Sequence, residues 1–277
     1  MMILIGGRGR LGRALRAARP HGEVVALDRR VYENWWRDDA GPDIDRCLEA
    51  APPGSVMLVA AGVLDPALPQ SDHQRVNFEL PVRVMERAAA AGLRVVTFGT
   101  VMERLVDHPN PYVASKARLG RHVAQRAAAG DAVTHLQIHT LYGGGEPASF
   151  MFLGQMCSAL RAGRPFEMSP GRQLREYHHV DDDVAAIHAV LATGVDGVLA
   201  LSHGAPTTLR ELALHVFGGL GREELLRLGA RPEPPDDNYA TVLQRPAVLE
   251  GVFFRSARDG VLDHVRSVLG AAREPRA

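Results

Sequence analysis

The 277-residue sequence contains two cysteines, one lysine and only 5% aromatic residues. Cys47 and Cys157 are too few for a disulfide framework or a cysteine-based metal site, so we expect a reducing compartment. The longest apolar run, residues 56–64, is too short to span a bilayer, and the N-terminus lacks the basic region of a signal peptide. We therefore expect a cytoplasmic protein without a membrane partner.

The charges of the chain balance. Lysine plus arginine and aspartate plus glutamate number 32 each. This balance excludes a global positive field, so we expect no nucleic acid as a partner. Within the basic set one residue stands apart, because Lys116 is the single lysine among arginines. Arginine cannot replace lysine where a compact ammonium with a tunable pKa is needed, which makes Lys116 a candidate for chemistry.

Short apolar runs alternate with helical patterns through the first half of the chain. The apolar runs cover residues 3–5, 24–27, 56–61, 93–98 and 133–138, and helical spacing follows at 11–18, 81–91 and 111–125. This alternation predicts an α/β fold, a Rossmann-type doubly wound parallel sheet with crossover helices. After residue 145 the pattern loosens, and we expect a small C-terminal α/β lobe.

Three glycines, Gly6, Gly9 and Gly12, lie between the first predicted strand and the first helix. Glycines at this spacing allow a tight turn and a close approach to a pyrophosphate at the helix N-terminus. Asp28 ends the second strand, where a carboxylate can accept hydrogen bonds from the ribose hydroxyls of NAD. Arg8, Arg29 and Arg30 lie close by and could hold the 2′-phosphate of NADP instead, or form a solvated turn. We predict NAD, with NADP as the alternative.

Tyr112 and Lys116 are four residues apart on one predicted helix, so they share a face. An ammonium beside a phenol can lower the phenol pKa and make Tyr112 a general acid/base. Thr100 ends the preceding strand, at the sheet edge where ligands bind in such folds. The alternative for this Tyr–Lys spacing is an ordinary exposed helix pair.

Together these motifs resemble the extended short-chain dehydrogenase/reductase superfamily, in its NAD-dependent branch of nucleotide-sugar epimerases, dehydratases and reductases. The resemblance covers roughly residues 1 to 215 and implies catalytic roles for Thr100, Tyr112 and Lys116. It implies cofactor contacts by Gly6, Gly9, Arg10, Leu11, Gly12, Asp28, Arg29, Asp43, Ile44, Ala60, Ala61, Gly62, Tyr112 and Lys116. It implies substrate contacts by Thr100, Tyr142 and Arg175, the last gripping a nucleotide diphosphate.

The same resemblance implies the division into domains, in which residues 1–145 form a dinucleotide-binding domain to which 176–200 return. Residues 146–175 and 201–277 then form the substrate-binding lobe. It also implies a structural role for Asn77 and a homodimer built through the helix that carries Tyr112.

Two departures from the family bear on the reaction. Only 11 residues separate Thr100 from Tyr112, and Val101 and Met102 stand where 4,6-dehydratases carry an acidic pair. A dehydratase reaction is therefore set aside, with Glu103 a poor substitute for that pair. The short loop favours a reductase of a keto group on a nucleotide-linked (deoxy)sugar. An epimerase with tightly bound NAD is the alternative, and a non-catalytic dinucleotide sensor is a third possibility.

We expect no metal site. His178, His179 and residues 181–183 resemble a ligand cluster in the sequence, but histidines in a strand alternate faces. We expect Asp182 to cap the following helix and His139 to be a core histidine with satisfied hydrogen bonds.

Overall fold

The structure, a computed structural model, describes residues 1–18, 23–107 and 109–271. The chain divides into two compact units. The first comprises Met1–Ile138 with Val184–Leu201, and the second comprises His139–Asp183 with Ser202–Ala277. The boundaries therefore lie at 138, 183 and 201, whereas the sequence analysis expected them at 145, 175 and 200.

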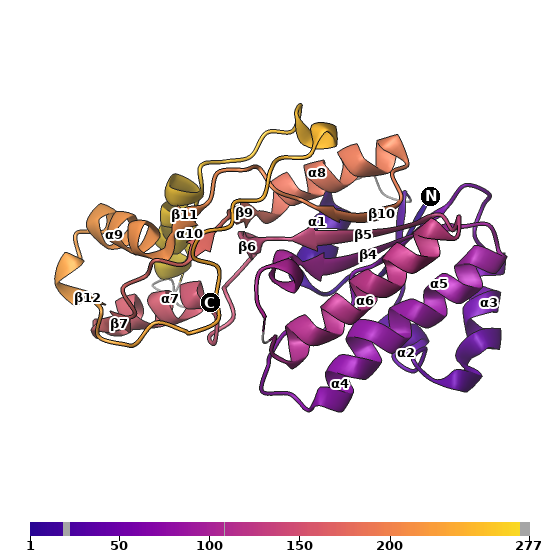
Figure 1. Ribbon diagram of the computed structural model, residues 1–277, viewed down its shortest axis with the longest axis horizontal. Coiled ribbons are helices and arrows are strands. Elements are labelled where there is room, and N and C mark those ends of the chain that lie inside the picture. Colours follow the sequence, from indigo (N-terminus) through magenta and orange to yellow (C-terminus); the bar gives the residue numbers. More distant parts are fainter. Residues whose placement is uncertain (19–22, 108, 272–277) are drawn as a thin grey trace. The chain divides into compact units, whose positions relative to one another are not determined.

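The first unit is built on a six-stranded sheet in the order β10-β5-β4-β3-β1-β2, in which every neighbouring pair is parallel (Figure 1). Its strands are β1 (Met2–Ile5), β2 (Val24–Ala26), β3 (Val56–Val59), β4 (Arg94–Thr100), β5 (Val133–Ile138) and β10 (Gly197–Ala200). The chain leaves β1 toward β2 and later returns to the other side of β1 with β3, so the switch point lies between β1 and β3. The predicted doubly wound parallel sheet is confirmed.

Helices cover both faces of this sheet, with α5 and α6 on one face and α8 on the other (Figure 1). The helices are α1 (Arg10–Ala17), α2 (Arg29–Tyr32), α3 (Gly41–Glu49), α4 (Gln70–Gln74), α5 (Leu80–Ala90), α6 (Pro111–Ala128) and α8 (Val180–Thr193). Short turns of other helix types are η1 (Asp38–Ala40), η2 (Arg75–Glu79) and η3 (Val101–Arg104). Apolar side chains of β1, β3 and β4 pack with those of α3, α5 and α6 into one hydrophobic core. The sheet and its helices hold the strand ends in fixed positions.

The start of α6 is set by local chemistry. The Asn110 side chain accepts a hydrogen bond from the backbone N–H of Val113 at 3.0 Å, and Pro111 occupies the first turn. This cap fixes Tyr112 in the first turn of the helix and Lys116 one turn later.

The second unit contains three two-stranded sheets. β6 (Thr140–Tyr142) pairs with β9 (Tyr177–His179), β8 (Leu174–Arg175) with β11 (Thr207–Thr208), and β7 (Phe166–Met168) with β12 (Leu226–Leu228). The helices are α7 (Phe152–Ala162), α9 (Leu209–Gly219) and α10 (Ala257–Ala271), with the turns η4 (Glu223–Leu225) and η5 (Ala247–Leu249). Apolar side chains of α7, α9, α10 and β7 form the core of this unit.

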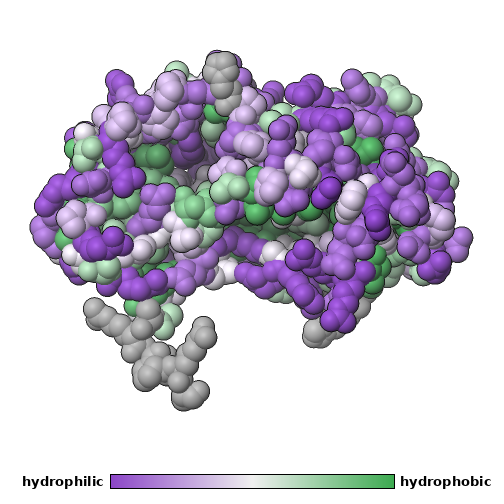
Figure 2. All heavy atoms as spheres, turned by 90° about the horizontal axis from the view of Figure 1, so that it is seen from below, coloured by the Kyte–Doolittle hydropathy of each residue, from purple (hydrophilic) through white to green (hydrophobic). Residues whose placement is uncertain are grey.

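The surface of the molecule is mixed in polarity. On the face shown in Figure 2, hydrophilic residues predominate, and hydrophobic side chains form patches between them. Among the described residues, no helix combines the length and the apolar character needed to cross a membrane.

The core of the second unit gives a stability prediction. Phe217 is fully buried on α9, and its ring stacks on that of Phe166 at a centroid distance of 5.7 Å. Phe217→Ala removes these contacts and leaves a cavity, so we expect the free energy of unfolding to fall by about 3–5 kcal/mol in urea denaturation. Phe253, which is 75% exposed, is the matched control, and Phe253→Ala should change it by less than about 0.5 kcal/mol. Equal losses in the two variants would contradict this core assignment.

Candidate active site

Lys116 is buried in the first unit. Its side chain leaves α6 and donates a hydrogen bond from Nζ to the carbonyl oxygen of Phe98 in β4 at 2.8 Å. The residue is only 6% exposed, so Tyr112 and Lys116 are not an ordinary exposed helix pair. The bond attaches the helix that carries Tyr112 to the strand that ends at Thr100. All three predicted catalytic residues therefore lie on two elements that are joined by this bond.

The pKa values of the two helix residues shift in opposite directions. Burial lowers the pKa of Lys116 to about 8, although the Glu103 carboxylate partly opposes the shift. Burial raises the pKa of Tyr112 well above its ordinary value, and the negative charge of Glu103 adds to the rise. The expectation that Lys116 lowers the phenol pKa is therefore wrong for this structure, because burial of the phenol and the negative charge of Glu103 raise it.

Glu103 has a role that the sequence analysis missed. Its side chain is 3% exposed and accepts hydrogen bonds from the backbone N–H of Thr100 at 2.7 Å and from Gln137 Nε2 at 2.9 Å. His135 Nε2 lies 3.2 Å from both carboxylate oxygens. Burial alone raises the pKa of Glu103, but the hydrogen bonds from His135 and Gln137 hold it below its ordinary value.

Two glycines make the space for the Glu103 carboxylate. A Cβ on Gly99 would lie 2.0 Å from Glu103 Oε1, and one on Gly120 would lie 2.8 Å from Oε2. Thr100 and Glu103 form a capping box around η3, in which the Thr100 hydroxyl accepts from the backbone N–H of Met102. Glu103 thus positions the turn that presents Thr100. The Thr-x-x-Glu spacing was the signal in the sequence that could have revealed this role.

In the glycine turn, residues 6–12, the backbone passes so close to neighbouring backbone that two positions have no room for a side chain. Gly6 has φ +93°, and a Cβ there would lie 2.3 Å from the backbone nitrogen of Ala61. A Cβ on Gly12 would lie 2.2 Å from the Gly6 carbonyl oxygen. Larger residues at Gly6 and Gly12 would therefore push β1, α1 and the segment after β3 apart.

Gly9 differs from these two glycines. A Cβ there would meet only the Gly6 carbonyl oxygen, at 3.5 Å, which is ordinary contact. The fold itself therefore does not require glycine at this position. Arg10 and Leu11 follow at the start of α1, with Leu11 buried.

The segment after β3 brings the glycine turn and Lys116 together. Ala60 and Ala61 lie against Gly6, and a Cβ on Gly62 would lie 3.5 Å from Lys116 Nζ. Asn77 holds this segment: it accepts from Val63 N–H and donates to the Val63 carbonyl, each at 2.9 Å. It also donates to Ser115 Oγ on α6 at 3.1 Å. The predicted structural asparagine therefore joins the segment to α6.

Asp28 caps α2 and forms an ion pair with an arginine. Its carboxylate accepts from the backbone N–H of Arg30 at 3.0 Å and forms an exposed ion pair with Arg8 at 3.0 Å. The hydrogen bond from the Arg30 N–H lowers the pKa of Asp28. Burial opposes this shift, and the charges of Arg8 and Arg30 add to the lowering. The remaining predicted cofactor residues have other neighbours: Arg29 lies 3.8 Å from Glu33, Asp43 pairs with Arg46, and Ile44 is buried in the core.

The predicted substrate residues of the second unit are held by neighbours. Arg175 Nη2 lies 2.5 Å from Asp237 Oδ1, and Nη1 donates to the Leu174 carbonyl at 2.8 Å. Tyr142 is buried, with its ring 5.3 Å from that of His179 and 6.0 Å from that of His264. Burial raises the pKa of Tyr142 to about 12.

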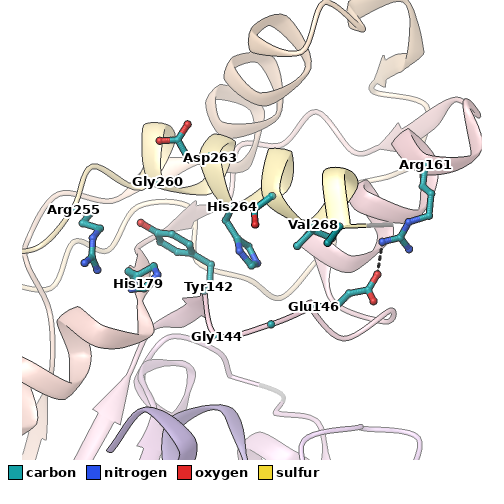
Figure 3. A pocket seen from close by; sticks show the side chains of 14 residues that line it. Tyr142, Gly144, Glu146, Arg161, His179, Arg255, Gly260, Asp263, His264 and Val268 are labelled. Carbon is teal, nitrogen blue, oxygen red and sulfur yellow. Dashed lines mark hydrogen bonds and ion pairs between the residues drawn. The ribbon is translucent and has the colours of Figure 1, made fainter. Parts of the chain in front are cut away.

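Tyr142 lines a cavity of about 960 Å³ within the second unit (Figure 3). Its lining also includes glycines 143–145, Arg161, His179 and Arg255. Arg175 is not among the lining residues. The cavity thus contains one of the two predicted substrate residues of this unit.

The expectations for Asp182 and His139 are wrong. Asp182 does not cap α8; it accepts from the backbone N–H of Arg255 at 2.8 Å and pairs with the Arg255 guanidinium. His139 is buried as expected, but its Nε2 has no hydrogen-bond partner in the described part of the chain. In both cases the partners depend on contacts between residues far apart in the chain, which the sequence pattern does not predict.

Comparisons with known proteins agree with this fold. A model of the NAD dependent epimerase/dehydratase family matches residues 2–199. No curated protein sequence matches the chain. UDP-glucose 4-epimerase of Thermotoga maritima with UDP-glucose is similar in structure, with a TM-score of 0.79 and 18% identity over 99% of this chain and 100% of that one.

Two further structures cover nearly all of the chain. The DesIV double mutant, a dTDP-glucose 4,6-dehydratase from Streptomyces venezuelae with NAD bound, has a TM-score of 0.74 and 20% identity over 96% of each chain. RMD from Pseudomonas aeruginosa complexed with NADPH has a TM-score of 0.75 and 17% identity over 98% of this chain and 99% of that one. These structures share the fold, and the family model matches more than half of the sequence. The chain therefore belongs to the NAD-dependent epimerase/dehydratase family.

Proposed function

We propose that the chain is an NAD(P)-dependent oxidoreductase that reduces a keto group of a nucleotide-linked sugar. The observation that carries this proposal is the placement of Lys116. Its buried ammonium lies close to Gly62, one helical turn from Tyr112, and bonds to Phe98 two residues before Thr100. A hydride carrier held at the glycine turn then lies beside a proton donor. The Thermotoga epimerase structure with UDP-glucose supports the substrate class.

The glycine turn fits a dinucleotide. The backbone itself requires Gly6 and Gly12, whereas the space at Gly9 leaves room for a phosphate group beside the N-terminus of α1. When bound, the nicotinamide supplies the hydride. In our proposal the residues that hold the cofactor are Gly6, Gly9, Arg10, Leu11, Gly12, Asp28, Arg29, Asp43, Ile44, Ala60, Ala61, Gly62, Tyr112 and Lys116.

In this proposal Thr100 and Tyr112 carry out the proton transfer to the substrate. Both hydroxyls hydrogen-bond the carbonyl oxygen of the sugar, and Tyr112 gives its proton as the oxygen becomes an alcohol. The phenol of Tyr112, whose pKa burial raises, is protonated near neutral pH and therefore has a proton to give. In this proposal Lys116 holds the nicotinamide ribose, and its hydrogen bond to the Phe98 carbonyl fixes the helix that carries Tyr112.

Tyr142 and Arg175 are the proposed substrate contacts of the second unit. For Arg175 to grip a diphosphate, its guanidinium must exchange Asp237 for phosphate oxygens. The homodimer expected from the family stays a prediction.

An epimerase is the second candidate. The similarity to the Thermotoga UDP-glucose 4-epimerase favours it, because that enzyme shares the fold over its whole length. A dehydratase finds less support, since Glu103 is buried against Thr100, His135 and Gln137 and is not free to act on a substrate. The presence of Thr100, Tyr112 and Lys116 together speaks against a non-catalytic dinucleotide sensor.

The dinucleotide content of the purified protein tests these proposals. The protein is denatured, and released NAD or NADP is identified by absorbance and mass. A protein that comes empty and binds added NADH or NADPH reversibly supports the reductase. Stoichiometric bound NAD favours the epimerase, and a folded protein that neither carries nor binds a dinucleotide contradicts both.

Replacement of Tyr112 tests the proton donor. Tyr112→Phe removes only the hydroxyl, so we expect kcat for reduction of a nucleotide 4-keto-sugar to fall about 100- to 10,000-fold, with NADH affinity retained. The rate is followed by the absorbance of NADH. Tyr239→Phe, at a partly exposed tyrosine in the second unit whose hydroxyl donates to the Pro234 carbonyl, is the matched control and should react at the wild-type rate. Undiminished turnover by Tyr112→Phe rules out this mechanism.

Replacement of Asp28 tests the choice between NAD and NADP. Asp28→Ala loses the ribose acceptor and frees Arg8 for a 2′-phosphate, so we expect NADH to bind at least about tenfold more weakly and NADPH to bind no more weakly. Calorimetric titration with both nucleotides measures the shift. Asp72→Ala, at a half-exposed carboxylate on α4, serves as the control. If Asp28→Ala leaves the preference between NADH and NADPH unchanged, Asp28 does not contact the ribose.

A further inference from the structure

A network of buried polar side chains lies where α6 packs on the sheet of the first unit, and the proposed reaction gives it no role. Its members, each at most 3% exposed, are Thr97 on β4, His135 and Gln137 on β5, and Glu103 on η3. Helix α6 covers them, because a Cβ on Gly120 would lie 3.3 Å from the His135 ring. A charge buried in such a place needs compensation nearby.

The hydrogen bonds of His135 determine the charge of this network. Its Nδ1 lies 2.8 Å from Thr97 Oγ1, and its Nε2 lies 3.2 Å from both carboxylate oxygens of Glu103. A neutral ring that accepts the Thr97 hydroxyl proton at Nδ1 and donates from Nε2 uses both contacts. An imidazolium would turn the Thr97 hydroxyl to the Thr134 carbonyl, at 3.4 Å a much poorer bond. With His135 neutral, the network carries the negative charge of Glu103.

Lys116 is the cation beside this negative charge. Its Nζ donates to the carbonyl oxygen of Phe98, and the Glu103 carboxylate accepts from the backbone N–H of Thr100, two residues further along β4. Glu103 also reaches α6 one helical turn beyond Lys116, since a Cβ on Gly120 would lie 2.8 Å from Glu103 Oε2. The ammonium and the carboxylate are therefore bound at neighbouring points of β4 and α6.

The charge of Glu103 acts on Lys116 through space. Burial lowers the pKa of Lys116 to about 8, and the negative charge of Glu103 opposes this shift. Burial likewise raises the pKa of Glu103, but hydrogen bonds from His135, Gln137 and the Thr100 backbone hold it below its ordinary value. Each of the two buried charges is thus stabilised by its surroundings in the charged form.

The other titratable groups near Lys116 are neutral. Tyr112, on the same helix, has a pKa that burial raises, so it is a phenol. His73 on α4 is buried, and its ring lies 6.4 Å from that of Tyr112. Its Nε2 donates to the Asp65 carbonyl at 3.1 Å, and its Nδ1 faces the amide nitrogen of Asn77, which is a donor. The ring therefore has no acceptor for a second proton, and neither group can replace the charge of Glu103.

A capping role alone does not explain the choice of glutamate. The turn after Thr100 needs one acceptor for the Thr100 N–H, and glutamine provides it equally well in a capping box. The second oxygen of Glu103 accepts from Gln137 Nε2 at 2.9 Å instead. Gly99 and Gly120 leave the room that the carboxylate occupies. These features serve an ionised carboxylate rather than a cap.

We propose that Glu103 is the counter-ion that keeps Lys116 charged, and that His135 and Gln137 keep Glu103 ionised in turn. Glu103 is a positioning residue, because it acts through Lys116. The role of this charge in turnover rests on the proposed function, in which Lys116 holds the nicotinamide ribose. The charge of Lys116 itself can be measured without any ligand.

NMR of the single lysine tests the proposal in the protein without ligand. Protein grown with isotope-labelled lysine is titrated as wild type and as Glu103→Gln, which keeps an acceptor for the Thr100 N–H and removes the charge. We expect the midpoint of the Lys116 signal to move from about 8 to lower pH, because burial then acts without an opposing charge. A folded Glu103→Gln protein with the wild-type midpoint overturns the proposal.

Two further variants separate the charge from the fold. Glu103→Asp keeps a carboxylate and should leave the Lys116 midpoint near about 8. Glu86→Gln on α5 removes a half-exposed carboxylate that pairs with Arg83, and it should also leave the midpoint unchanged. Circular dichroism confirms that each variant is folded. A folded Glu103→Asp protein whose midpoint falls contradicts the proposal, even where Glu103→Gln does not fold.

The pH dependence of turnover provides a second readout. Lys116 loses its proton as pH rises through its pKa, so the alkaline fall of kcat/KM should begin at lower pH in Glu103→Gln than in wild type or Glu86→Gln. An unchanged profile in an active Glu103→Gln enzyme contradicts the role of this charge in turnover. If the midpoint moves but the wild type has no reductase activity, the counter-ion role stands and the proposed reaction fails.

Discussion

The hydrogen bond from Lys116 to the Phe98 carbonyl is the constraint on which the candidate site depends. An ammonium that is 6% exposed is costly to bury, and a carbonyl at the end of β4 offsets part of that cost. The same bond fixes α6 against the strand that ends at Thr100, so Tyr112 cannot move independently of the sheet. Arginine is too large and too basic to take this place, which explains the single lysine in a chain whose other cations are all arginine.

Glu103 supports this arrangement from the other side of Thr100. Its carboxylate accepts from the Thr100 backbone and is held by His135 and Gln137 on the neighbouring strand. It also acts on Lys116 at a distance, because its negative charge favours the ammonium that burial disfavours. The cost of this arrangement is the absence of side chains at Gly99 and Gly120, where a Cβ would collide with the carboxylate.

Local signals in the sequence were sufficient for the sheet, the glycine turn and the Tyr112–Lys116 spacing, because each depends on residues close together in the chain. They could not predict partners far apart in the chain. Glu103 meets His135 after 32 residues, Arg175 meets Asp237 after 62, and Asp182 meets Arg255 after 73. The direction of the Tyr112 pKa shift likewise depends on burial, which tertiary packing sets.

The single lysine allows a direct measurement of the central claim. Protein grown with isotope-labelled lysine gives one side-chain NMR signal, which belongs to Lys116 without further assignment. A pH titration of that signal should give a pKa of about 8, and addition of NADH should shift the signal. A pKa near the ordinary 10.5 together with no response to NADH or NADPH would show that Lys116 is neither buried beside Phe98 nor part of a dinucleotide site.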